Sequence, residues 1–279
     1  MIDELVVALD GSEASLRALR VGGAFARKLY VPISTITVIV PGLDAFPDAA
    51  WLDEHATLPD LEVEQLLVPA DDTVAALLDR ADEGSGTVLC MTSHGRRGLS
   101  EAVLGSVSAA VVRASRKPIL VVGPNAAVPA SFDAVEVCFH DGATPARALG
   151  PAGDWVGQLG ATPWLVTVQD PAESFAVNHA AGVELRAAAE RLRDRARLTP
   201  SRLLRDADPV RAIAEHADDV GAALVVAATH ARHGVDDVLI GSVAKGLVHR
   251  VHQPVLLVGP AVVDTAPTGA SATSRDFRL

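Results

Sequence analysis

The chain has 279 residues, of which 49% are hydrophobic and only 4% aromatic. This length predicts about two domains, with enough apolar material for well-buried strands and helices. The formal net charge of -11 at pH 7 argues against a nucleic-acid partner or an anionic membrane surface, because the overall field repels phosphate groups. Any phosphate site must therefore be local.

Cysteine usage and the chain ends restrict the class of protein further. The two cysteines, Cys90 and Cys138, each lie in an apolar run, where the simplest interpretation is a small buried hydrophobe. The N-terminal segment lacks the features of a signal peptide, and no apolar stretch reaches the ~18 residues of a membrane span. We expect a soluble, cytoplasmic protein without membrane contact, and a flexible tail over residues 263–279, which are small and polar.

The first half of the chain alternates strand patterns with helical patterns. A short apolar run ends at Asp10, Gly11 and Ser12, where a tight turn leads into a helix. The second strand is β-branched and apolar, as in a strand buried on both faces. The predicted strands cover 4–9, 33–40, 62–69, 87–92 and 119–122; helices cover the stretch after Ser12, 73–82 and 103–115, and 41–59 is a loop with a short helix.

The second half follows the same order. Its predicted strands cover 134–138, 164–168, 202–204, 223–228 and 255–258, and its helices run through Trp155 and over 183–197, 209–218 and 242–251. Strands that alternate with helices predict an α/β fold with a parallel sheet and right-handed crossovers.

One segment of the chain occurs twice. Residues 92–106 return in altered form as residues 228–242, so that His94 maps to His230 and Gly105 to Gly241 at a constant spacing of 136 positions. Each copy leads on to a similar final strand. The chain is therefore a tandem repeat, and we predict domains over 1–126 and 131–262.

The repeated segment carries phosphate-binding chemistry. In an open parallel sheet, ligands bind beyond the carboxyl ends of the strands where strand order reverses, so the turns after the first and fourth strands are the candidates. Asp10 follows the first strand, where its carboxylate suits ribose or adenine, or equally caps the next helix. After the fourth strand, glycine permits close approach to phosphate and a helix start supplies N–H donors. The residues concerned are Gly95, Gly98, Gly105 and Ser106.

These residues resemble the universal stress protein family. Thr92-x-x-Gly95, nine residues and then Gly105-Ser106 is similar to the family signature Gly-x2-Gly-x9-Gly-Ser/Thr, and residues 7–12, Val-Ala-Leu-Asp-Gly-Ser, are similar to its first strand and turn. The resemblance covers nearly the whole chain as two consecutive family domains. It implies two tandem open-twisted five-stranded parallel sheets with helices on both faces, of the adenine nucleotide α-hydrolase-like, Rossmann-like class.

For one subset of that family, the resemblance implies an ATP site, with Mg²⁺ as a companion ion and other adenine nucleotides as alternatives. The implied nucleotide-binding residues of the first repeat are Asp10, Val38, Thr92, His94, Gly95, Gly98, Gly105 and Ser106, and a second, weaker site comprises Asp141, Val168, Gly241 and Ser242. The resemblance also implies that the final strands of the two repeats meet at a shared interface, so that one chain mimics a family dimer.

Departures from the signature distinguish the two repeats. Thr92 stands at the first glycine of the signature and modifies the first site, whereas Ala228 and Ala231 replace both leading glycines of the second repeat. If either position needed a positive φ, alanine would cost about 1 kcal/mol or more. We expect the second repeat to bind more weakly or to serve as a partner surface.

Other candidates have simpler interpretations. His94 and His230 either contact phosphate or order their loops by hydrogen bonding, and Arg96 and Arg97 either offset triphosphate charge or stay solvated. The histidines 230, 249 and 252 have no metal-ligand spacing, so we predict no metal site. The tryptophans are most simply core or interface residues.

The leading hypothesis is a stress-response regulatory protein that binds an adenine nucleotide, ATP first, mainly in the first domain, and acts on a protein partner, as a homodimer. The chain has no Gly-Lys-Ser/Thr phosphate loop and no catalytic residue stands out, so at most slow ATP hydrolysis is expected. The alternatives are a non-nucleotide scaffold or interaction module with degenerate sites, and an enzyme of the wider nucleotide hydrolase-like group.

Overall fold

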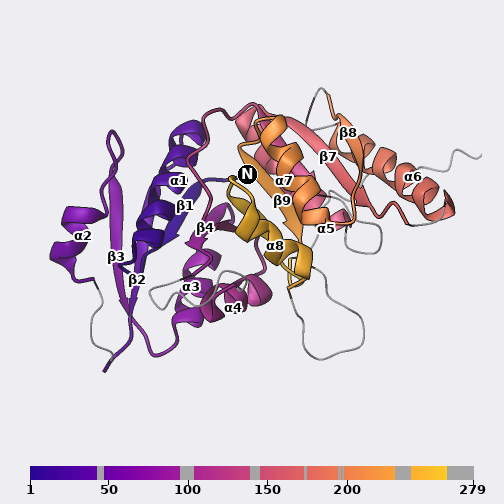
Figure 1. Cartoon of the computed structure of the whole chain (residues 1–279). Coiled ribbons are helices and arrows are strands. Elements are labelled where there is room, and N and C mark those ends of the chain that lie inside the picture. Colours follow the sequence, from indigo (N-terminus) through magenta and orange to yellow (C-terminus); the bar gives the residue numbers. More distant parts are fainter. Residues whose placement is uncertain are drawn as a thin grey trace, which may run out of the picture.

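A computed structural model describes the chain over residues 1–42, 47–94, 104–138, 145–172, 175–193, 196, 198–229 and 240–262. Strands and helices alternate through both halves (Figure 1). The first half contains β1 (Glu4–Ala8), α1 (Glu13–Leu29), β2 (Ile33–Ile39), α2 (Ala49–His55), β3 (Val63–Pro69), α3 (Thr73–Asp82), β4 (Thr87–Thr92), α4 (Ser106–Ala114) and β5 (Ile119–Val122). The second half contains β6 (Ala134–Cys138), α5 (Pro145–Leu159), β7 (Thr162–Gln169), α6 (Phe175–Leu192), β8 (Ser201–Arg205), α7 (Pro209–Asp219), β9 (Leu224–Ala228), α8 (Ser242–Arg250) and β10 (Val255–Val258).

The described strands form one continuous ten-stranded sheet in the order β3-β2-β1-β4-β5-β10-β9-β6-β7-β8. Neighbouring strands are parallel within each half, as the alternation of strands and helices predicted. The two halves meet through antiparallel pairing of β5 with β10, in which Val255 lies opposite Val121 and Leu257 opposite Ile119. Both the fold class and the shared interface of the final strands are confirmed.

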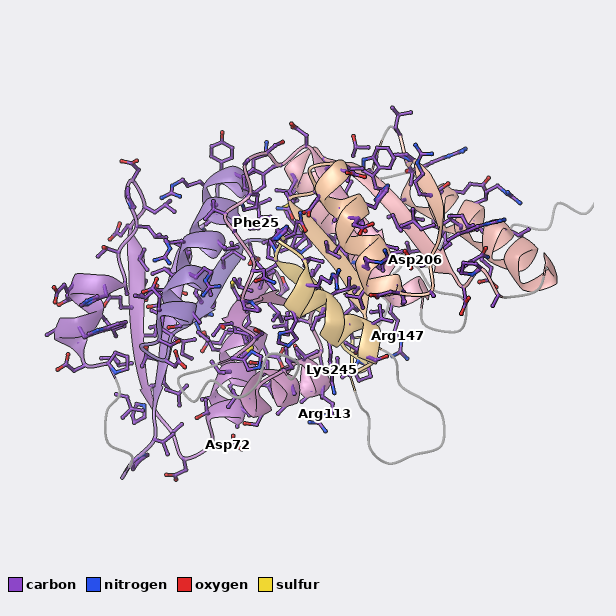
Figure 2. All side chains as sticks on the ribbon, in the orientation of Figure 1. Phe25, Asp72, Arg113, Arg147, Asp206 and Lys245 are labelled. Atoms are coloured by element: carbon purple, nitrogen blue, oxygen red, sulfur yellow. The ribbon has the colours of Figure 1, made fainter. Side chains whose placement is uncertain are left out.

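Two apolar cores cover the two faces of this sheet. One face is packed by α1, α2, α5 and α6 and the other by α3, α4, α7 and α8, and each core runs through both halves. On the first face, the Phe25 ring of α1 meets the Trp155 ring of α5 edge-on at a centroid distance of 5.1 Å, and Figure 2 shows Phe25 near the junction. Trp155 is thus a core residue at the interface, as predicted.

The helices that flank the candidate sites differ in length from their predictions. The prediction for α4 began at Val103, which lies outside the described residues, and the observed helix begins at Ser106 after its N-cap Gly105. The long helix of the second half was predicted over 183–197, whereas the observed α6 runs from Phe175 to Leu192. Gly182 lies inside this helix, and a Cβ there would meet nothing within 4 Å.

Both cysteines have apolar surroundings. Cys90 is buried and Cys138 is half-buried, and burial raises the pKa of the Cys90 thiol to about 12. A thiol with such a pKa stays protonated at neutral pH, which agrees with the interpretation of Cys90 as a small hydrophobe.

The junction between the two halves, formed by β5 and β10 and the segments around them, has two equivalent sets of close contacts. A Cβ at Gly123 would lie 1.8 Å from the Val248 carbonyl oxygen, and one at Gly259 would lie 2.1 Å from the Val112 carbonyl oxygen. Gly259 and Val248 each lie 136 positions after Gly123 and Val112, respectively. The last helix of each half therefore touches the backbone that follows the last strand of the other half.

Arginine side chains repeat this symmetry within each half. Arg17 of α1 donates to the Pro124 carbonyl oxygen, and Arg147 of α5 donates to the Pro260 carbonyl oxygen at 2.7 Å. These bonds fix the chain segments that leave β5 and β10, beside the two glycines.

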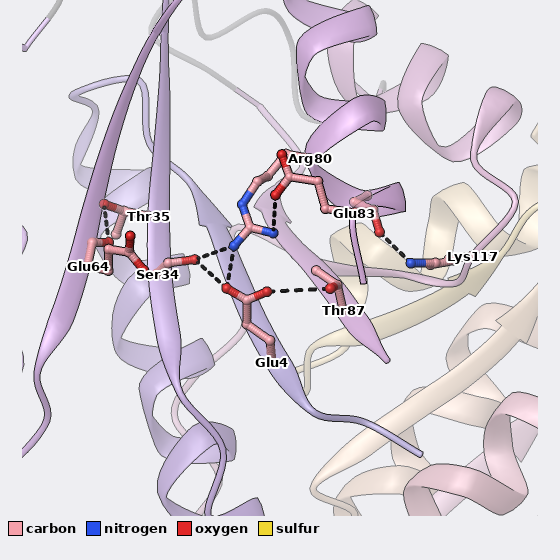
Figure 3. Close-up of polar contacts among 9 residues, drawn as sticks. Glu4, Ser34, Thr35, Glu64, Arg80, Glu83, Thr87 and Lys117 are labelled. Atoms are coloured by element: carbon pink, nitrogen blue, oxygen red, sulfur yellow. Dashed lines mark hydrogen bonds and ion pairs between the residues drawn. The ribbon is translucent and has the colours of Figure 1, made fainter. Parts of the chain in front are cut away.

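Each half also buries a glutamate from its first strand against a helix cation. Glu4 pairs with Arg80, and its Oε1 accepts from the Ser34 hydroxyl at 3.0 Å (Figure 3). In the second half, Glu136 is fully buried and its Oε2 lies 2.7 Å from His216 Nδ1. His216 lies 136 positions after Arg80. The second half thus has a histidine where the first half has an arginine.

We predict that Gly123→Ala and Gly259→Ala destabilise the protein by about 1–3 kcal/mol each, because the new methyl group must displace a carbonyl of the opposite half. Urea unfolding followed by circular dichroism measures the effect. Gly157→Ala in α5 is the matched control, since a Cβ there meets nothing within 4 Å and a helical alanine is favoured. Equal stability of all three variants would contradict the close packing.

Glu136→Gln tests the buried pair in the second half. Burial raises the pKa of Glu136 above its ordinary value of 4.5, so the contribution of this group to stability is present below about pH 4.5 and lost as the pH rises through the raised value. The stability of Glu136→Gln relative to the unsubstituted protein should therefore increase from pH 4.5 upward, as measured by urea midpoints against pH.

Asp206→Asn provides a control of opposite sign. The backbone N–H of Asp208 and then the Arg211 guanidinium hold the pKa of the Asp206 carboxyl below its ordinary value of 3.8. Asp206 therefore contributes stability above pH 3.8 that is lost in acid, and Asp206→Asn should be relatively destabilised at neutral pH. The interpretation of Glu136 fails if both variants show pH profiles of the same sign.

Candidate functional site

The candidate site of the first repeat lies at the carboxyl ends of β1 and β4. These strands are neighbours in the sheet, with Val7 opposite Cys90. The chain leaves β1 into α1 on one face and leaves β4 toward α4 on the other. Strand order reverses between them, and an open parallel sheet binds ligands at such a point.

The turn after β1 places a carboxylate at this edge. Gly11 has φ +82°, a conformation that favours glycine. Asp10 Oδ1 accepts from the Ser12 N–H at 3.0 Å and from the Ser12 hydroxyl at 2.6 Å. Ser12 is itself the N-cap of α1 and accepts from the Ser15 N–H at 3.1 Å. The capping role weighed for Asp10 thus belongs to Ser12, and Asp10 orients the cap.

The residues at the end of β4 form hydrogen bonds with one another and with α4. Thr92 Oγ1 donates to the His94 carbonyl oxygen at 2.9 Å and accepts from the His94 N–H at 3.2 Å. The Ser93 hydroxyl lies 3.1 Å from His94 Nδ1, and the Ser108 hydroxyl of α4 donates to the Thr92 carbonyl oxygen at 2.9 Å. These bonds hold the end of β4 against the first turn of α4, so His94 does take part in ordering its loop.

The first turn of α4 has no side-chain cap among the described residues. Its N-cap, Gly105, has φ −56° and donates its N–H to the Ser93 carbonyl oxygen at 2.8 Å. A Cβ at Gly105 would lie 3.1 Å from that oxygen, so glycine is needed here for close approach. By contrast, α1, α2, α3 and α7 each begin with a Ser or Asp whose side chain caps the first turn. Uncapped N–H groups at a helix start favour an anion.

The remaining predicted residues of the first site fall at different places. Val38 is buried near the carboxyl end of β2, next to β1 in the sheet. Ser106 is the exposed first residue of α4. Gly95 and Gly98, and with them the arginines 96 and 97, lie outside the described residues. The structure therefore brings together the carboxyl ends of β1, β2 and β4 with the start of α4.

The second repeat keeps the helix start but lacks the side-chain hydrogen bonds that surround it in the first repeat. Gly241 is the N-cap of α8 with φ −56° and no side-chain cap, and Ser242 is the first, exposed residue of that helix. Ala228 and Ala244 occupy the positions of Thr92 and Ser108, 136 positions on, so the hydroxyls that close the first loop have no counterpart. Val168 lies in β7 beside β6.

The aspartate of the second site is displaced in sequence. Asp10 is the second residue after β1, whereas Asp141 is the third residue after β6. Asp141, His230 and Ala231 lie outside the described residues. The match between Asp141 and Asp10 stays a prediction.

Replacing the first signature glycine causes no backbone strain. Among the described residues, the non-glycine residues with positive φ are Tyr30 and Asp60. Neither Thr92 nor Ala228 is among them, so the conditional cost of alanine does not arise at Ala228. Thr92 instead contributes hydrogen bonds that a glycine would lack.

Sequence reasoning overlooked the hydroxyls of Ser93 and Ser108, although Ser108 follows the signature as Gly-Ser-x-Ser. It also treated His249 only as a possible metal ligand. In the structure, His252 lies 3.0 Å from Asp218 and is separate from His249. The described part of the chain contains no group of three metal-binding side chains, and none of its helices is long and apolar enough to span a membrane.

Comparison with known proteins agrees with this architecture. The family model of the universal stress protein family matches residues 1–123 and 132–259. No curated protein matches the chain. A universal stress protein from Archaeoglobus fulgidus DSM 4304 is 20% identical with a TM-score of 0.65, over 92% of this chain and 98% of that one. A functionally unknown protein from Pseudomonas aeruginosa PAO1 is 16% identical with a TM-score of 0.62, over 93% of each chain.

The fold and the two matched segments define a tandem α/β protein, in which each half contributes five parallel strands. The chain belongs to the universal stress protein family.

Thr92→Val tests the closure of the loop after β4. The substitution removes a hydroxyl that makes two hydrogen bonds, so we expect a loss of about 1 kcal/mol in the free energy of unfolding. Thr37→Val is the matched control, because the buried Thr37 hydroxyl has no partner, and it should be neutral or stabilising. Urea titrations compare the two, and a larger loss at Thr37 would contradict the assigned role of Thr92.

Proposed function

We propose that the protein is a stress-response regulatory protein that binds an adenine nucleotide, ATP first, mainly in its first repeat. The observation that carries this proposal is the uncapped first turn of α4 beside a loop closed by Thr92 and Ser108. Its N–H groups suit phosphate, and Asp10 stands at the neighbouring strand end for ribose or adenine. The second repeat, without these hydroxyls, is the weaker site.

Ligand binding rather than fast chemistry follows from the residue types at the site. The chain has no phosphate-loop lysine, and the described side chains around β1, β4 and α4 offer serines, a threonine, a histidine and one aspartate. An ATP phosphate needs a positioned metal and a base or water-orienting group for rapid transfer. We therefore propose a nucleotide sensor with Mg²⁺ carried by the ligand, and slow hydrolysis at most.

A scaffold without nucleotide is the second candidate, and the second repeat favours it. Ala228 and Ala244 remove the hydroxyl ties there, while its helix start is retained. In that case the two halves would provide a rigid ten-stranded platform for a partner. The two candidates differ in whether the first repeat holds a nucleotide at all.

Several broader expectations belong to the same proposal. We propose cytoplasmic location, a regulatory protein partner and further association into a homodimer, with domains over 1–126 and 131–262. The antiparallel pairing of β5 with β10 already joins two repeats in one chain. A homodimer would therefore have to use another surface.

Matched variants of the two repeats test the proposal. Gly105→Asp places a carboxylate at the start of α4, and Gly241→Asp does the same at α8. Native mass spectrometry of the purified protein with ATP and Mg²⁺ should show one tightly held adenine nucleotide per chain, lost in Gly105→Asp because negative charge opposes phosphate, and retained in Gly241→Asp.

The alternative outcomes are equally informative. No nucleotide at millimolar ATP on the unsubstituted protein would overturn the proposal and favour the scaffold. Loss of the nucleotide only in Gly241→Asp would move the working site to the second repeat. Asp10→Asn, which keeps the size of the side chain, guards against a folding defect in Gly105→Asp.

A further inference from the structure

A histidine of the second repeat lies against the candidate site of the first. His249, in the last turn of α8, meets the His94 ring at a centroid distance of 5.1 Å, with the ring planes 55° apart. His94 is the second residue after Thr92, the last residue of β4. The contact therefore joins the second repeat to the ligand edge of the first.

The antiparallel junction explains why His249 reaches this edge. Because β10 runs opposite to β5, the last turn of α8 arrives at the carboxyl end of β5, next to the end of β4. Gly123 admits the Val248 carbonyl at a distance that a Cβ would block. Asn125 Nδ2 also donates to the His249 carbonyl oxygen at 2.7 Å. Two contacts from the segment that follows β5 thus fix the backbone position of His249.

The two rings have unused hydrogen-bonding atoms. His94 Nδ1 is next to the Ser93 hydroxyl, but His94 Nε2 and both ring nitrogens of His249 are buried without a hydrogen-bond partner in the described structure. A buried polar atom left unpaired costs the free energy of its desolvation, so a ligand that pairs with it is favoured. Burial, and secondarily His94, lowers the pKa of His249. A neutral imidazole still has one N–H donor, and the donor of His249 has no partner among the described residues.

His94 adjoins the start of α4. A Cβ built on Gly105 would lie 3.7 Å from His94 Cα, so His94 lies next to the helix start whose N–H groups are uncapped, and the His249 ring packs on His94. We propose that His249 is a binding residue of the first repeat's nucleotide site and donates a hydrogen bond to its phosphate groups. This inference rests on the proposed function, and it makes the working site a product of both repeats.

The chain offers a matched control for this residue. Arg113, in the last turn of α4, lies 136 positions before His249 and is its counterpart in the first repeat. Figure 2 shows Arg113 at the end of α4, where its side chain is exposed. By the symmetry of the junction, Arg113 faces the ligand edge of the second repeat and not that of the first.

Calorimetric titration of the full chain with adenosine, AMP and ATP separates phosphate contacts from contacts to the nucleoside. His249→Leu should weaken ATP about tenfold or more, as expected when a hydrogen bond to a charged group is lost, and should leave adenosine affinity unchanged. His249→Gln, which keeps an N–H donor, should recover part of the ATP affinity. Arg113→Gln should bind ATP at the first site like the unsubstituted protein.

Three outcomes distinguish the two levels of the proposal. If the unsubstituted protein binds no nucleotide, the proposed function and this inference both fail. If it binds ATP and His249→Leu binds equally well, or loses ATP and adenosine in the same proportion, only the role of His249 is overturned. In the unsubstituted protein, the imidazole resonances of His249 should shift with ATP but not with adenosine, which tests the contact without a substitution that affects folding.

Discussion

The backbone pairing between β5 and β10 is the constraint on which the rest of the structure depends. It turns two parallel five-stranded halves into one sheet and lets a single core run along each face. It also brings the last helix of each half against the segment that leaves the last strand of the other. Gly123 and Gly259 are required at those points because a carbonyl oxygen occupies the space of a side chain.

The same pairing sets what the two repeats are able to do. Each half is built on the same elements, yet the hydrogen bonds around the signature differ. Thr92 and Ser108 of the first half correspond in sequence to Ala228 and Ala244 of the second, which have no hydroxyl group. A repeat that loses these hydroxyls is under less constraint to bind, but it remains essential to the sheet. Its last helix also supplies His249 to the edge of the first half. Under the proposed function, the first half is the binding half and the second half supports it.

Much of this fold was predictable from the sequence. The strands β4, β5, β6 and β10 and the helix α3 follow the predicted bounds. All of these except β6 are compact patterns that end at or directly before Gly, Asp or Ser. The start of α8 at Ser242, directly after Gly241, was predicted correctly, whereas α4 was predicted from 103 and begins at Ser106. The family resemblance implied that the two final strands meet, but the side-chain contacts between the halves were not predictable, because they depend on register across the β5–β10 pairing. His249 illustrates this: its spacing along the chain says nothing about His94, which lies 155 positions away.

The opposite direction of β5 and β10 has a geometric consequence for any partner. Strands within each half are parallel, so the carboxyl edges of the two halves face opposite rims of the common sheet. The carboxyl ends of β4 and β9 therefore lie at opposite rims of the sheet. One flat protein surface cannot cover both at once, and a molecule that recognises the occupied first site leaves the rim of the second free for a separate contact.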